Sequence, residues 1–414
     1  MKVAIIGGGP AGSTAAALLA RSGADVVIFD EGNRPEVIAG ESLVPGVVPI
    51  LRRLGIEDQV AQIGVRKPGV TFCSSGGQAF AFGFDALPGK YPPYAYNVPR
   101  PAFDQLLFES ALGSGARSIA ARATISAEGN RLQLSSESLG LVSRWHGNQP
   151  DLVVDATGRR RTSANLLKIG SKIGPRRDMA HFAHYEGFLA ESPPGQVLIN
   201  HLERGWSWRI PLRGRMSFGI VLDQAAAAAL GREPAERLDA AMRADAQIVR
   251  SIKNVRRITE AQTYGNYQLI SHQGAGPNWA AVGDAFGFVD PMLSPGMMLA
   301  MQGAVILEDS LARLPMDQAL ASYATKITGL LEAWMEFIAY FYDGRIFSMY
   351  ENATDFQSRH RHLPTGIFEQ FVRGHLASMA SGFSTDSPYS RGVLRGFERF
   401  AKGGAVPARR LAII

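Results

Sequence analysis

The chain has 414 residues, of which 46% are apolar, so it can bury the core of one large domain or two closely joined ones. No apolar run reaches the roughly eighteen residues of a membrane span, and the single cysteine, Cys73, excludes an internal disulfide and a cysteine-ligated metal. We therefore expect a cytoplasmic protein without a metal, and its modest net charge of +6, spread along the chain, indicates solvated surface rather than a nucleic-acid interface.

The first thirty residues combine apolar runs, glycines and one acid in a fixed order. Residues 3–6 are an uncharged apolar run, and residues 7–12 read Gly-Gly-Gly-Pro-Ala-Gly. Residues 13–20 have the composition of a helix, and residues 26–29 form a second apolar run that ends on Asp30. This order of strand, glycine-rich turn, helix, strand and acid is typical of a dinucleotide-binding unit. We expect no signal peptide, because the unit starts at once.

Each residue of the turn has a physical role in holding a dinucleotide. Gly7 permits the tight turn, Gly9 lets the backbone approach a pyrophosphate, and Gly12 lets the helix pack closely on the strand. Pro10 and Ala11 begin the helix, whose free N–H groups and partial positive charge favour the phosphates.

An acidic pair follows the second strand of the unit. Asp30 lies where a carboxylate accepts hydrogen bonds from the ribose hydroxyls of an adenosine, and Glu31 takes the flanking position. The alternative, a glycine-rich turn that binds nothing, is disfavoured because the strand, helix and acid are all in place. The motif does not choose between NAD and FAD.

Further candidate residues lie between residues 40 and 100. Gly40-Glu41-Ser42 follows a polar loop, and residues 47–54 have helical apolar spacing. Lys67 lies between turn-forming residues and precedes alternating phenylalanines that indicate a strand. By residue type alone, Lys67 is as well explained as a solvated loop lysine. Arg100 opens an amphipathic helix.

The middle of the chain predicts a return to the first sheet and then an antiparallel layer. Residues 117–150 read as short strands and turns, and residues 151–158 read as a buried strand that ends on Asp-Ala-Thr-Gly. Residues 180–222 have the alternation of antiparallel strands. Residues 225–243 are rich in alanine and predict two helices, the second opened by Pro234.

The last third of the chain predicts one more buried strand and then helices. Residues 279–282 are apolar, and residues 283–291 follow them with Gly-Asp at the start and Asp-Pro at the end. A long helix is expected from Met297 to about residue 314. Aromatic side chains at helical spacing over residues 320–342 indicate core packing, and residues 403–414 read as a loose basic end.

The order of these elements predicts an α/β fold. A Rossmann-type FAD- or NAD-binding domain is interleaved with an antiparallel β-sheet substrate domain, and the C-terminal part is helical. The nucleotide-binding domain is expected in three segments, 1–75, 101–175 and 266–315. The substrate domain is expected at 76–100 and 176–265, and the helical part at 316–414.

Three segments together resemble one group of flavoproteins: residues 7–12, 155–158 and 283–291. The group includes p-hydroxybenzoate hydroxylase, geranylgeranyl reductases and flavin-dependent halogenases. The resemblance implies FAD as the cofactor, with the late Gly-Asp segment on its ribityl and diphosphate and the next turn and helix beside the isoalloxazine. The residues that this assigns to FAD are Gly283, Asp284, Pro291, Gly296 and Met297, with Arg100 on the phosphate side.

Within the group, the chain is most similar to the halogenases. Residues 205–212 carry the W-x-W-x-I-P signature in full, and Glu41, Ser42 and Lys67 lie in segments that match as well. The resemblance implies that Glu41 and Ser42 border the cofactor, and that Lys67 stands between flavin and substrate, where it carries or directs hypohalous acid. It also implies that Trp206 and Trp208 keep the substrate away from the flavin peroxide. Core packing on a strand is the alternative for this tryptophan pair.

One turn departs from the halogenase pattern. The family reads Ser-Ser-Gly or Ser-Thr-Gly there, and successive backbone N–H groups hold the halide. This chain reads Ser294-Pro295-Gly296. Proline has no N–H, so the halide site loses a donor, worth about 1 kcal/mol or more, and the ring adds bulk.

This departure leads us to predict an FAD-dependent monooxygenase that hydroxylates an electron-rich aromatic ring through a flavin C4a-(hydro)peroxide. The ring is of the indole, tryptophan or phenol type, either free or carried by a protein or peptide, as in the flavoproteins that mature tryptophylquinone cofactors. The alternative is an FADH2-dependent halogenase of a tryptophan, indole, phenol or pyrrole substrate. A third hypothesis is a flavin-binding protein without turnover.

The expected co-substrate is O2, and either NAD(P)H or a separate flavin reductase supplies the electrons. The sequence leaves open the substrate, its carrier, the electron source and the oligomeric state.

Overall fold

The structure is a computed structural model, and it describes residues 1–414 except 74–78, 190–192, 203, 266–267, 350–364 and 403–414. The predicted basic end, 403–414, therefore lies outside the described residues. No helix in the described part of the chain is long and apolar enough to cross a membrane.

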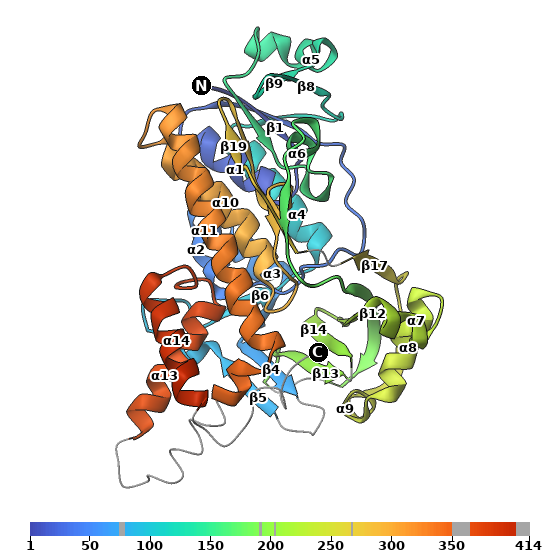
Figure 1. Ribbon diagram of the computed structural model, residues 1–414. Helices are drawn as coiled ribbons and strands as arrows, with labels where there is room; N and C mark the ends of the chain where they lie inside the picture. The colour runs from blue at the N-terminus through green and yellow to red at the C-terminus, as the bar shows by residue number, and fades with distance from the viewer. Residues whose placement is uncertain (74–78, 190–192, 203, 266–267, 350–364, 403–414) are drawn as a thin grey trace.

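A six-stranded sheet gathers strands from three distant parts of the chain (Figure 1). Its order is β19 (Ala275–Gly276), β20 (Trp279–Ala281), β10 (Leu152–Asp155), β1 (Lys2–Ile6), β2 (Asp25–Phe29) and β7 (Arg117–Ile119). The strands from β20 to β7 pair in parallel, and β19 is antiparallel. Parallel strands buried on both faces read as continuous apolar runs, which is why the sequence predicted β1, β2, β10 and β20.

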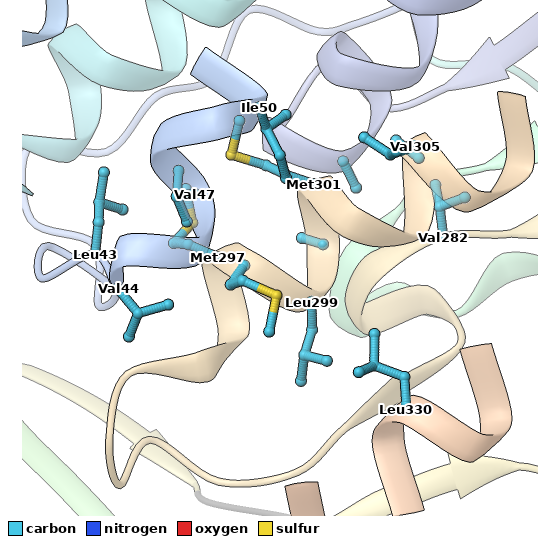
Figure 2. Packing of buried hydrophobic residues seen from close by; sticks show 14 of the residues in the cluster. Leu43, Val44, Val47, Ile50, Val282, Met297, Leu299, Met301, Val305 and Leu330 are labelled. Atoms are coloured by element: carbon cyan, nitrogen blue, oxygen red, sulfur yellow. The ribbon is translucent and has the colours of Figure 1, made fainter. Parts of the chain in front are cut away.

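Four long helices pack around this sheet. They are α1 (Pro10–Arg21), α4 (Arg100–Gly113), α10 (Pro295–Leu311) and α11 (Met316–Tyr342). α1 contacts both α4 and α10, and α10 also packs on α11. Figure 2 shows Met297, Met301 and Val305 of α10 among apolar side chains of α2 (Val48–Leu54), the segment before it, and α11. This packing fixes the first turn of α10 at the end of the sheet.

An eight-stranded sheet forms the second layer. Along its path lie β16 (Ile252–Arg257), β12 (Met179–Phe188), β15 (Arg215–Leu222), β14 (Gly205–Leu212), β13 (Val197–Leu202), β4 (Gly69–Cys73) and β5 (Ala79–Gly83), and β17 (Gln262–Gly265) pairs with β12. All pairs are antiparallel except β13 with β4. One face packs on α8 (Pro234–Ala244) and its neighbours α7 (Gln224–Leu230) and α9 (Ala246–Arg250). The other face is thereby left for a ligand.

The C-terminal part is helical, as predicted. The aromatic residues of α11 at helical spacing are buried, including Trp334, Phe337 and Phe341, so this stripe belongs to the core. α13 (Thr365–Ala380) and α14 (Pro388–Lys402) follow, and Figure 1 draws them beside the end of α11 and the β4–β5 hairpin.

Shorter elements connect these layers, and one of them differs from the prediction. They are α3 (Glu57–Ile63), α5 (Ser136–His146), α6 (Thr162–Leu166), β3 (Val65–Lys67), β6 (Ala95–Asn97), β8 (Ile125–Glu128), β9 (Arg131–Leu134), β11 (Ser171–Ile173), β18 (Leu269–Ser271), β21 (Gly287–Phe288) and the 3-10 turns η1 (Pro45–Val47), η2 (Phe84–Ala86), η3 (Gly158–Arg160) and η4 (Gly283–Ala285). α5 is a helix where the sequence predicted strands and turns. Its N-cap, Ser135, accepts a hydrogen bond from the N–H of Ser138, a start signal that we did not recognise.

Candidate active site

A cavity of about 490 Å³ lies between the two sheets, where the carboxyl ends of β1 and β10 face β13 and β14. Among the predicted site residues, those in its wall are Gly9, Pro10, Ala11, Glu41, Ser42, Arg100, Trp206, Trp208, Gly283, Asp284, Pro291, Gly296 and Met297. Gly7, Gly12, Asp30, Glu31 and Lys67 are not in this wall. Ligands bind at this position in many α/β sheets, because loops and helix N-termini converge there.

The glycine-rich turn forms one end of the cavity. Gly7 has a φ of +107°, and its N–H donates to the carbonyl of Phe29 at 2.9 Å. A Cβ on Gly12 would stand 2.0 Å from the carbonyl oxygen of Gly7, so this glycine serves close packing. A Cβ on Gly9, in contrast, would meet no heavy atom within 4 Å and would point into open space. That space, at the N-terminus of α1, fits a pyrophosphate.

The two acids after β2 lie beside the turn rather than in the cavity wall. Asp30 stands next to Gly8, where an added Cβ would meet its carboxyl carbon at 2.7 Å, and it pairs with Arg34 at 2.9 Å. Glu31 is exposed and pairs with Arg160 at 2.9 Å. The half-buried position of Asp30 beside the turn suits it for a ribose contact at the edge of the site, whereas Glu31 is exposed.

Replacing Asp30 with alanine should weaken FAD binding about tenfold or more. Without the carboxylate, the FAD ribose would lose charge-assisted hydrogen bonds worth about 1.5–3 kcal/mol. Titration of the FAD-free protein with FAD, followed by flavin fluorescence, measures the affinity. Glu31→Ala is the matched control and should change it little. Unchanged affinity in Asp30→Ala beside a loss in Glu31→Ala would move the ribose contact to Glu31.

Arg100, Arg159 and Asp284 are among the charged residues in the cavity wall. Arg100 donates to both carboxylate oxygens of Asp104 at 2.8 Å and to the carbonyl of Ala39, which fixes its guanidinium in the wall. Burial raises the pKa of Asp284 to about 6, although the charges of Arg159 and Arg100 oppose the shift. Sequence reasoning missed Arg159, whose only signal was its place directly after the Asp-Ala-Thr-Gly segment.

Glu41 and Ser42 carry a buried polar network behind the wall. His184 Nε2 lies 2.7 Å from Glu41 Oε1, and both side chains are almost fully buried. Sequence reasoning missed His184, because nothing in its local pattern on β12 links it to a residue 143 positions away. An acid and a histidine so placed hold the Gly40-Glu41-Ser42 segment rigidly against the cavity.

Lys67 lies directly behind Ser42 and is 1% exposed, so the alternative of a solvated loop lysine is wrong. Its Nζ donates to Ser42 Oγ at 2.8 Å and to the carbonyl of Leu43 at 2.9 Å. Burial lowers the pKa of Lys67 to about 7, because the charged amine loses its hydration. A buried lysine that is readily neutral at physiological pH is suited to chemistry rather than to solubility.

The side of Lys67 away from Ser42 faces a second, smaller pocket. The residues in its wall are Val44, Lys67, Val70, Phe72, Phe82, Gly83, Phe84, Leu293, Phe341, Ala377 and Ala380. They come from β3, β4, β5, η2, the end of α11, α13 and the segments directly before η1 and α10. Lys67 thus stands between the large cavity, through Ser42, and an apolar pocket.

The tryptophan pair lines the opposite side of the large cavity. The rings of Trp206 and Trp208 share one face of β14, with centroids 5.7 Å apart. Trp206 Nε1 donates to the hydroxyl of Tyr342 at 3.0 Å, and this hydroxyl donates to Asp290 at 2.8 Å. Tyr342 is the last residue of the helix whose aromatic stripe the sequence predicted as core, and its hydroxyl joins the helical part to the site. The tryptophans are buried in the core and also lie in the cavity wall, and their role toward a substrate stays a prediction.

The turn that departs from the halogenase pattern, residues 294–296, begins helix α10 at the edge of the cavity. Leu293 and Ser294 have φ values of 66° and 58°, an unusual left-handed pair before the helix. Pro295 is the first helical residue, where its missing N–H would have no intrahelical partner in any case. Ser294, Gly296 and Met297 are in the cavity wall, and the buried Pro295 is not. The proline ring therefore does not line the large cavity, and the effect of residue 295 on a halide stays a prediction.

Comparison with known proteins decides the family. The sequence model described as tryptophan halogenase matches residues 2–91 and 85–350. The chain belongs to the tryptophan halogenase family. Members of this family are FAD-dependent oxidoreductases, and FAD is the cofactor that the large cavity fits.

Individual relatives agree with this assignment. The tryptophan 2-halogenase of Chondromyces crocatus is 29% identical over 369 residues, covering 83% of this chain and 68% of that protein. The flavin-dependent halogenase gsfI of Penicillium aethiopicum is 29% identical over 340 residues, covering 75% of this chain and 64% of that protein. The chain thus spans about two thirds of the length of these curated relatives.

Solved structures confirm the α/β fold. The flavin-dependent brominase Bmp2 superposes with a TM-score of 0.75 at 22% identity, covering 97% of this chain and all of that one (100%). The flavin-dependent halogenase CmlS superposes with a TM-score of 0.72 at 25% identity, covering 97% of this chain and 77% of that one. These comparisons favour the halogenase alternative over the hydroxylase that the sequence led us to predict.

Proposed function

We propose that this chain is an FADH2-dependent halogenase that acts on an electron-rich aromatic ring of the phenol, indole or pyrrole type. The observation that carries the proposal is the place of Lys67, buried between the FAD cavity and an apolar pocket. Family membership supports the same reaction. The test is the mass of the products formed from representative aromatics with reduced FAD, O2 and bromide, where we expect gain of bromine.

The residues of the site suit this chemistry. FAD, when bound and reduced, supplies the activation of O2 that a halide needs to become electrophilic. Ser42 and the Leu43 carbonyl orient the Lys67 amine toward the boundary of the two spaces. A neutral amine there can hydrogen-bond an electrophilic halogen species or accept it. The apolar walls on the far side exclude water, which would otherwise consume the reagent.

Hydroxylation is the second candidate function, and Pro295 is the observation that favours it. A halide in the family's turn relies on converging N–H groups, and this chain offers those of Gly296 and Met297 without one from residue 295. A weaker halide site would let oxygen transfer compete. The two functions differ in the product, which gains either a halogen or an oxygen.

Replacing Pro295 with serine should tighten halide binding about fivefold. The serine restores an N–H worth about 1 kcal/mol at the N-terminus of α10, where anions are favoured. The measurement is a bromide titration of the FAD-loaded protein, followed by the flavin spectrum. Ser294→Ala is a suitable control, because it alters a side chain of the same turn and adds no donor. Equal affinity in Pro295→Ser would mean that residue 295 does not face the halide.

The electron source and the cellular setting belong to this proposal as well. We expect a separate flavin reductase or NAD(P)H to supply reduced flavin, and oxidation of NAD(P)H by the purified protein alone separates these two sources. The substrate ring is either free or carried by a protein or peptide. A single buried cysteine, Cys73, suits the reducing cytoplasm.

A further inference from the structure

The pocket beside Lys67 has a wall of hydrocarbon. Its aromatic side is built by Phe72, Phe82 and Phe341, with ring centroids 5.5 Å apart for Phe72–Phe82 and 5.3 Å for Phe72–Phe341. Among the described residues that line it, Lys67 is the only titratable side chain. An aromatic ring can therefore pack closely against this wall. A charged ligand group would meet a single titratable side chain among the described lining residues, the amine of Lys67.

That amine cannot serve as partner for a cation. The Nζ of Lys67 donates hydrogen bonds to Ser42 Oγ and to the carbonyl of Leu43, and it lies 5.4 Å from the centre of the Phe84 ring. When protonated it repels a second ammonium, and when neutral it offers no charge. No carboxylate lines the described part of the pocket. An ammonium group carried in with the ring would find no counter-charge among these described lining residues, which is strongly unfavourable.

The pocket is also narrow. It encloses about 20 Å³, space for a single water, so a ring enters only when the side chains around it move. Ala377 and Ala380 of α13 contribute small side chains to the wall. A small, flat ring needs the least movement, and a substituted amino acid needs more space and a charge partner as well.

We propose that the substrate enters this pocket as an aromatic ring without an ammonium group, so that free amino acids such as tryptophan and their amines are excluded. The inference rests on the proposed function, which states that the ring is halogenated. It narrows the class of substrate that the protein accepts. Neutral phenols, pyrroles and indoles are accepted, either as small molecules or as rings carried by a protein or peptide that have no ammonium group beside the ring. The tryptophan named for one relative is then not the substrate of this chain.

The test uses pairs of ligands that differ in charge and little in size. Tryptophol is compared with tryptamine, and 4-ethylphenol with tyramine, by calorimetric titration of the FAD-loaded protein. We expect the neutral member of at least one pair to bind and its amine to bind about a hundredfold more weakly, with L-tryptophan as weak as the amine. Equal binding within the pairs, or no binding by either neutral ligand, would overturn the proposal.

A charge placed in the wall should reverse the preference. Ala380→Asp supplies the missing carboxylate, and Ala380→Asn has the same size without the charge. Relative to Ala380→Asn, the aspartate variant should bind tryptamine about tenfold more tightly and tryptophol no better. Thermal denaturation shows whether both variants fold, and the ligand pairs on the unmodified protein decide the matter if they do not. If a folded Ala380→Asp protein bound tryptamine no more tightly than Ala380→Asn does, the placement of the ring in this pocket would be contradicted.

Binding and turnover are read separately, so the two proposals fail in different ways. Selective binding of neutral rings without any halogenated product would reject the halogenase function and leave the pocket assignment intact. Halogenation of free tryptophan as efficiently as of tryptophol would reject the substrate class and leave the function intact.

Discussion

Replacing Lys67 with methionine should abolish halogenated product, by at least about a hundredfold, while oxidation of reduced flavin continues. Methionine keeps most of the buried stem and its packing, and it removes only the amine that Ser42 and Leu43 orient. Product mass and flavin reoxidation are followed in the same sample. Lys67→Ala should lose product as well, with an added loss of stability from the cavity it leaves.

Two outcomes separate the functions. If Lys67→Met halogenates at the normal rate, the amine has no chemical role and its burial is structural. If the protein hydroxylates instead, the lysine only positions the ring, and activity should fall without vanishing.

The same residue predicts a pH dependence of stability. The pKa of Lys67 is about 7 in the folded protein and has its ordinary value near 10.4 in the unfolded chain. Between these values the unfolded state binds more protons, so this group makes folding more favourable as pH rises through the window. Lys67→Met should remove that slope, which urea denaturation at several pH values measures. A slope that is the same in both proteins would contradict the low pKa.

Replacing Gly9 with valine should abolish FAD binding in a protein that still folds. An added Cβ meets no heavy atom within 4 Å in the protein, so the side chain extends into the space where the pyrophosphate must lie. The measurement is the flavin content of the purified protein, with circular dichroism to check the fold. Gly9→Ala, with its smaller side chain, should bind FAD more weakly than the unmodified protein.

Gly12→Ala is the instructive contrast, because its Cβ would stand 2.0 Å from the carbonyl oxygen of Gly7 and disturb the fold itself. A folded Gly9→Val protein that purifies with a full complement of FAD would reject the assignment of the turn.

Local patterns account for the part of the fold that the sequence predicted. The strand, glycine-rich turn and helix at the N-terminus are specified by neighbouring residues, and so are the buried strands β10 and β20. The predicted break between α7 and α8 is also local, since Gly231 and Pro234 punctuate the chain there. α5 was missed because Val142 is its single fully buried apolar residue and its cap is a lone serine.

The site itself depends on contacts between distant residues, and the sequence indicated these less well. Whether Lys67 is solvated or buried depends on Ser42 and on α13, which packs near it from the far end of the chain. The pairing of His184 with Glu41 and of Tyr342 with Trp206 joins residues more than a hundred positions apart. No periodicity carries that information, and only the family resemblance pointed to Lys67 and the tryptophans.

One measurement tests the central claim most directly. The protein, reduced FAD and tryptophol are mixed with bromide under 18O2, and the product is examined by mass spectrometry. A brominated product is recognised by the two isotopes of bromine, and a hydroxylated product by the mass of one 18O atom. The halogenase function predicts a brominated indole without 18O on the ring, and predicts its loss in Lys67→Met. A product that carries 18O and no bromine would contradict it and would establish the hydroxylase in its place.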